Sequence, residues 1–129
     1  MAVPHRGWPD WYASSQLVAT EPLTVTSLVG AVQAWDSCLD VAASEYEPSG
    51  EPAGAVVAAA LYECRPLELL AQTALVDFVL GNSDTMTRVE ATDRVLAERG
   101  SRLRLREQRL IKLIVEARLQ TKQTDPSAS

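Results

Sequence analysis

Residues 28–52, LVGAVQAWDSCLDVAASEYEPSGEP, hold the pattern that decides the fold. As far as Tyr46, apolar residues recur every three or four positions and polar residues take the other side, which is the spacing of an amphipathic helix. The inward positions are Leu28, Val32, Trp35, Leu39, Ala42 and Tyr46. Two prolines and a glycine in residues 47–52 then end the helix in a turn. The next element is therefore expected to run antiparallel to the first.

The stretch 53–80 is apolar on almost every side, which is typical of a helix with several neighbours. Pro66 interrupts it, because proline suits the first turn of a helix and disfavours helical geometry at the preceding residue. We expect one helix to about Cys64 and another over 66–80. Gly81 and Asn82 supply the stop signal.

The start of the next helix is open to two interpretations. Ser83 or Asp84 can cap it, or it begins one turn later, where Thr87 and Glu90 have the spacing of a capping box. The same segment, 81–89, loosely resembles the turn of a helix-turn-helix, but a helix cap after a turn explains it equally well. This helix precedes the basic end of the chain.

The last helix is expected over residues 101–122, with a break at Gly100 and Ser101. Helical spacing places an apolar set on its inward side and a polar set opposite. The inward set is Leu103, Leu110, Ile114 and Ala117, flanked by Ile111 and Leu113, and the opposite set is Arg102, Arg109 and Glu116.

The chain has 129 residues, of which 47% are hydrophobic, and this fits a single domain with one core. We predict an all-α fold, a compact bundle of four to five helices over residues 23–122. An extended arm, residues 1–22, precedes the bundle, and a polar tail, residues 123–129, follows it. The arm carries Trp8, Trp11 and Tyr12, which gain free energy only by docking on their own domain or on a neighbouring subunit.

The two cysteines, Cys38 and Cys64, are too far apart in sequence for a CxxC redox or zinc motif. We expect reduced, buried thiols. A disulfide is the alternative if the helices that carry them pair about the turn at residues 48–52.

Charge is divided unevenly along the chain. Residues 1–98 carry 4 basic and 14 acidic side chains, whereas residues 99–122 carry 8 basic and 2 acidic ones. Such asymmetry indicates an electrostatic partner, which is the chain's own acidic body, a neighbouring identical subunit or nucleic acid. The interaction residues expected on the basic helix are Arg99, Arg102, Arg104, Arg106, Arg109 and Lys112.

The sequence lacks the usual catalytic motifs, among them a Gly-rich phosphate loop, a nucleophile with an attendant histidine and His-Glu-x-x-His. Asp36 and Asp40 are interpreted as a solvated helix face and not as a cation site. Glu63 and Glu68 flank Pro66, with a nearby arginine at position 65 as their charge partner. We expect no enzymatic activity, no cofactor and no metal.

The function expected from these features is that of a non-enzymatic interaction or assembly subunit. One form is a phage-type structural adaptor that builds homo-oligomers through its arm and its basic C-terminal helix. The alternatives are a small nucleic-acid-binding accessory protein that uses the Arg-rich helix, and a regulatory protein-binding module.

The location expected is the cytoplasm, or a virion if a phage encodes the chain. Residues 1–6 are not followed by a long apolar run, so neither a signal peptide nor a membrane anchor is indicated there. Charged residues also interrupt the most apolar stretch, 53–80.

Overall fold

The computed structural model describes residues 25–124 and forms a bundle of α-helices without a strand in that range. Its elements are α2 (Val25–Tyr46), the 3-10 turn η1 (Glu47–Ser49), α3 (Ala53–Glu63), α4 (Arg65–Gly81), α5 (Arg88–Ala97) and α6 (Arg99–Thr124). The all-α bundle predicted from the sequence is confirmed. The aromatic arm with Trp8, Trp11 and Tyr12 lies outside the described residues, as does the tail after residue 124.

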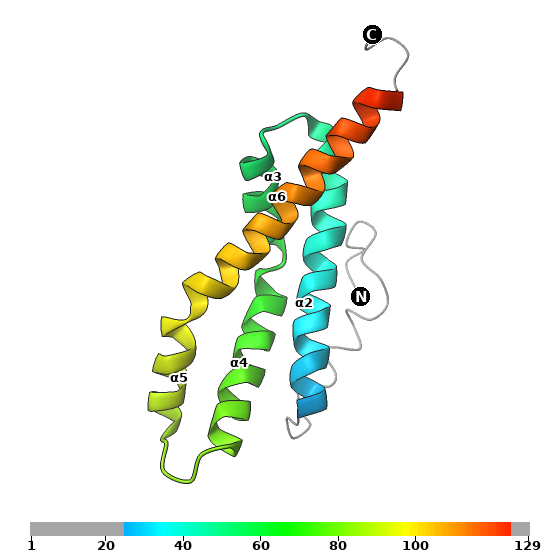
Figure 1. The fold of residues 1–129 in the computed structure, drawn as a ribbon. Coiled ribbons are helices and arrows are strands. Elements are labelled where there is room, and N and C mark those ends of the chain that lie inside the picture. Colours follow the sequence, from blue (N-terminus) through cyan, green and yellow to red (C-terminus); the bar gives the residue numbers. More distant parts are fainter. Residues whose placement is uncertain (1–24, 125–129) are drawn as a thin grey trace, which may run out of the picture.

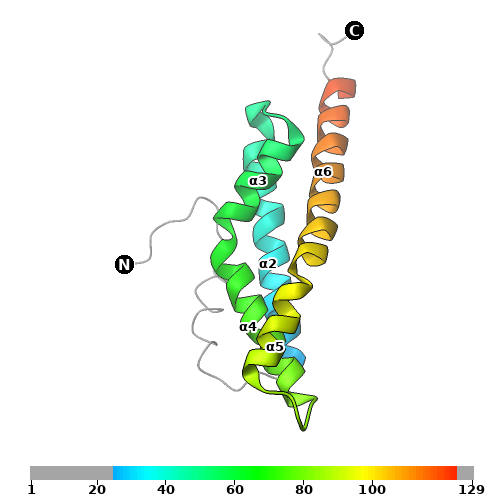
Figure 2. The same cartoon turned by 90° about the vertical axis from the view of Figure 1, so that its left-hand side faces the viewer.

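The helices form three antiparallel runs (Figure 1). α2 makes the first run, α3 and α4 together make the second in the opposite direction, and α5 followed by α6 returns in the direction of α2. α6 crosses in front of α2 and α3 in Figure 1 and forms one edge of the molecule in Figure 2. The basic end of the chain therefore lies along one side of the acidic body.

The turns of the first two runs follow from local sequence. Gly50 adopts a φ of 78°, which glycine tolerates better than other residues, and its N–H donates to the carbonyl of Glu47. Pro66 lies in the first turn of α4, and α3 ends two residues before that helix begins. The predicted turn after Tyr46 and the predicted break before Pro66 are both confirmed.

The start of α5 is the capping box at Thr87 and Glu90. The Thr87 side chain accepts from the N–H of Glu90, whose carboxylate accepts from the N–H of Thr87. The break before the last helix falls at Glu98, not at Gly100 and Ser101 as expected. The N–H of Arg102 donates to the carbonyl of Glu98, so the first turn of α6 already encloses the glycine.

The core has two parts. The larger lies between α2, α3, α4 and α6 and includes Trp35, Leu39, Leu67, Leu110 and Ile114. The smaller joins α4 to α5 through Val76, Ala91 and Val95. The inward residues predicted for the middle of α2 and of α6 are therefore confirmed.

A disulfide bond joins Cys38 of α2 to Cys64 at the junction of α3 and α4. Both residues are buried, as expected, but the expectation of reduced thiols is wrong. The antiparallel pairing of α2 with α3 brings the two Cα atoms to 5.9 Å, which is within bonding range. The bond fixes the middle of α2 to the break in the second run.

We expect the disulfide to contribute about 3 kcal/mol to the free energy of unfolding, because it closes a loop in the unfolded chain. Urea unfolding with and without a reductant measures the contribution. A variant with Cys38→Ala and Cys64→Ala is the control, and its unfolding should not respond to the reductant. Two free thiols in the intact mass of the native, unreduced protein would contradict the bond.

Candidate functional site

Glu68 on α4 is the centre of a buried ion-pair cluster. Its side chain is only 6% exposed. The Nε of Arg99 donates to one carboxylate oxygen at 2.7 Å and the Nη2 of Arg99 to the other at 3.2 Å, while Arg65 donates at 3.0 Å. Burial alone would raise the pKa of Glu68, but the two arginines outweigh it and the pKa is lowered. The same contact raises the pKa of Arg99.

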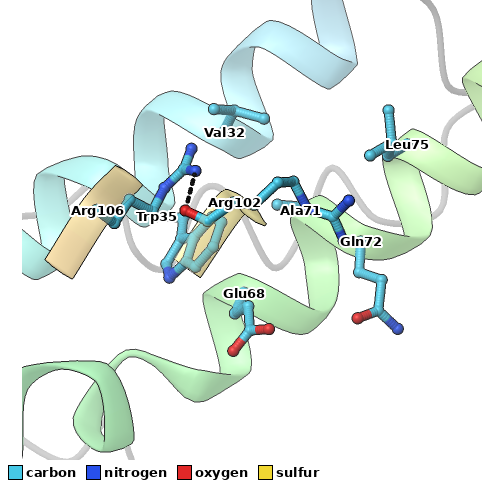
Figure 3. A pocket seen from close by; sticks show the side chains of 8 residues that line it. All are labelled: Val32, Trp35, Glu68, Ala71, Gln72, Leu75, Arg102 and Arg106. Carbon is cyan, nitrogen blue, oxygen red and sulfur yellow. Dashed lines mark hydrogen bonds between the residues drawn. The ribbon is translucent and has the colours of Figure 1, made fainter. Parts of the chain in front are cut away.

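A second contact between α6 and the body centres on Trp35 of α2. The guanidinium of Arg106 lies 4.0 Å from the centre of the indole ring, which is cation–π geometry. Arg106 also donates to both oxygens of Asp36, at 2.8 and 3.3 Å. In addition, it donates to the carbonyl of Arg102, which is the dashed line in Figure 3. One arginine thus joins α6 to both an aromatic ring and a carboxylate of α2.

Two further arginines extend this contact toward the C-terminus. Arg109 donates to Asp40 at 2.6 Å, and Arg118 donates to the carbonyl of Glu47 at 3.1 Å. The interpretation of Asp36 and Asp40 as a solvated face is therefore wrong. Their carboxylates bind arginines of the last helix, because α6 crosses α2 at these positions.

Arg102 and Arg109 also depart from the sequence prediction. Both were placed opposite the apolar side of the last helix, but both are half-buried against the body. Arg102 donates to the carbonyl of Val95, and burial lowers its pKa. Each directly precedes an inward leucine, Leu103 or Leu110, so it lies about 100° from the inward side and not opposite it, and its long side chain reaches the body.

A hollow beside Trp35 is the most enclosed space at this site (Figure 3). Its volume is about 30 Å³, which holds one water molecule and no substrate. The indole Nε1 of Trp35 and one Nη of Arg102 are buried and have no hydrogen-bond partner within residues 25–124. A single bridging water suits these donors, and the walls carry acceptor oxygens on Glu68 and Gln72.

The outer face of α6 differs from the inner one. We define it as Ile111, Val115 and Leu119, which follow one another at four-residue spacing, with the cations Arg104 and Lys122 that helical spacing places on the same side. The three apolar side chains are 39%, 44% and 54% exposed. Lys112 flanks this face and is 77% exposed.

The structure thus divides the six cations expected to interact. Arg99, Arg102, Arg106 and Arg109 contact the chain's own body, whereas Arg104 and Lys112 point to solvent. The apolar stripe of the outer face was missed as a site. Its signal, three aliphatic residues at four-residue spacing beside the inward set, is present in the sequence, but only Ile111 was assigned, as a flank of the inward side.

Comparison of the chain with protein-family models, with curated proteins and with solved structures gives no match in any of the three. Among the described residues, no group of three or more histidine, cysteine or acidic side chains is arranged to hold a metal. None of the helices between residues 25 and 124 has the length and apolar character needed to cross a membrane.

Replacing Glu68 with Gln should lower the free energy of unfolding by about 2 kcal/mol at neutral pH, since a buried charged hydrogen bond is lost but Arg99 can still reach water. The folded pKa of Glu68 lies below its ordinary value of 4.5, so the stabilisation is present above that pH and is lost as the pH falls further. Urea unfolding of both proteins over a pH series should therefore show a difference in the free energy of unfolding that becomes smaller in acid. Asp93→Asn, at an exposed position of α5, is the matched control. A difference in the free energy of unfolding that stays the same at all pH values would contradict an ionised Glu68.

Proposed function

We propose that this protein is a non-enzymatic interaction subunit that docks other subunits through the outer face of α6. One observation carries the proposal: the aliphatic stripe of Ile111, Val115 and Leu119 lies on the side of the helix that the bundle leaves uncovered. Contiguous exposed apolar side chains with a polar rim are characteristic of protein-binding surfaces.

The chemistry of the face indicates what it binds. Arg104, Lys112 and Lys122 are exposed around the aliphatic stripe, so a partner surface that is apolar at its centre and acidic at its edge fits it best. A basic rim steers such a partner and sets its register, while the aliphatic side chains supply the burial.

The ion pairs favour a protein partner over nucleic acid. Arg99, Arg106 and Arg109 already have carboxylate partners in the same chain, so phosphate would have to displace those contacts. Few cations are left for phosphate, whereas tight binding to a duplex normally uses several.

We further propose that the protein works in an oxidising setting. Buried disulfides persist in secreted proteins and in virions and are rare in the cytoplasm. Of the two locations expected from the sequence, the disulfide between Cys38 and Cys64 favours the virion, which agrees with a phage-type structural adaptor.

Photo-crosslinking tests the docking surface. A benzophenone amino acid in place of Leu119 should give a defined covalent adduct with another protein chain in the native host. The same amino acid in place of Asp93, an exposed residue of α5, is the control for non-specific reaction.

A second variant separates docking from folding. In this variant Ile111, Val115 and Leu119 are all replaced with Ser. It should no longer form the adduct that a crosslinking reagent attached to Lys122 gives in the wild-type protein. Its free energy of unfolding should change little, because surface substitutions usually change it by about 0.5 kcal/mol each or less. Equal adduct yields at positions 119 and 93 would overturn the proposal.

A further inference from the structure

A second surface of α6 is hollowed. A groove of about 440 Å³ lies between the C-terminal half of α2, with η1, and the C-terminal half of α6. Its lining includes the apolar residues Ala43, Leu113, Ile114 and Ala117, and the carboxylates of Asp40, Glu47 and Glu116, which we call its rim.

Small side chains on both walls keep the groove open. Ala43 faces it from α2 and Ala117 from α6, so neither helix fills the space between them. Leu113 is left 45% exposed beside it. An aliphatic side chain from outside would therefore bury apolar surface that the fold itself leaves in contact with water.

Two of the three rim carboxylates have an ion pair within residues 25–124, and the third does not. Asp40 is paired with Arg109, and Glu116 lies 4.0 Å from the exposed Lys112. The carboxylate of Glu47 makes no ion pair with the residues between 25 and 124, because Arg118 binds its backbone carbonyl instead. An incoming surface with cations at its edge is complementary to this rim.

We infer that the groove receives the outer face of α6 from a second copy of this chain. The inference rests on the proposed function and names its partner. The outer face offers what the groove lacks, since its stripe of Ile111, Val115 and Leu119 is aliphatic and its flanking side chains, including Arg104 and Lys122, are basic.

Charge selects this arrangement over the symmetric ones. Two outer faces packed on each other would bring Arg104 and Lys122 against like charges, and two grooves would bring acidic rims together. Groove and outer face lie on different sides of the same helix, so each copy can give one contact and accept another. Such a head-to-tail contact closes into a ring or continues as a filament.

Charge reversal on either side of the contact tests the inference. The groove variant carries Glu47→Lys and Glu116→Lys, and the outer-face variant carries Arg104→Glu and Lys122→Glu. Light scattering after size exclusion measures the mass of each full-length protein at low and at high salt. Circular dichroism and urea unfolding confirm that both variants are folded.

The wild-type protein should form oligomers at low salt that dissociate as salt is raised, because exposed charges are screened. Each variant alone should be monomeric, and an equimolar mixture of the two should assemble again, since every contact in the mixture joins opposite charges. A monomeric wild-type protein at low salt would overturn the inference, and so would two folded variants that do not assemble when mixed. In either case, an adduct at position 119 with a different protein would still support the proposed function. If no adduct forms at position 119, both the proposed function and this inference are wrong.

Discussion

The hydrogen-bonded ion pair between Glu68 and Arg99 is the contact on which the placement of α6 depends. Glu68 is buried on α4, where an unpaired carboxylate would be costly. Arg99 is the first residue of α6, so the pair fixes the point at which this helix leaves the α4 and α5 end of the bundle. α6 is continuous from that point to Thr124, and fixing its first turn therefore sets the side that every later residue presents.

The rotation of α6 about its own axis, set by its first turn, gives the helix an inner and an outer face. Arg106 and Arg109 meet Asp36 and Asp40 of α2, and part of the charge asymmetry in the sequence is thereby balanced inside the molecule. These two pairs are partly exposed, so each contributes on the order of 1 kcal/mol or less to stability. Their larger effect is on register, because a planar guanidinium group donates to a carboxylate in few orientations. Arg104 and Lys122, on the outer face, are exposed instead.

Features set by neighbouring residues could be predicted from the sequence, and features set by the rotation of one helix against another could not. The break before Pro66 depends on a few adjacent residues and was predicted, and the capping box at Thr87 was one of the two helix starts that the local sequence allowed. The cations of α6 occur on every side of the helix, so their spacing did not say which of them face the body. Arg102 was placed opposite the apolar set from helical spacing, but it is half-buried and its guanidinium donates to the carbonyl of Val95. The disulfide was also left as an alternative because it depends on how two helices pack. The cysteines are 26 residues apart in sequence, and this separation does not predict the 5.9 Å between their Cα atoms.

The same contacts that place α6 also shape the groove beside it. One wall is the half of α2 that carries Asp40 and Ala43, and the disulfide at Cys38 holds that half against the junction of α3 and α4. The other wall is α6, held to α2 by Arg109 and Arg118. Because both walls are fixed within the chain, the groove does not need a partner to form, and the proposed docking would cost little reorganisation. The outer face shares its helix with one wall of the groove, so the angle between the two surfaces is also constant. In the proposed head-to-tail assembly, a constant angle would give every successive copy the same rotation, which is the condition for a regular ring or filament instead of an irregular aggregate.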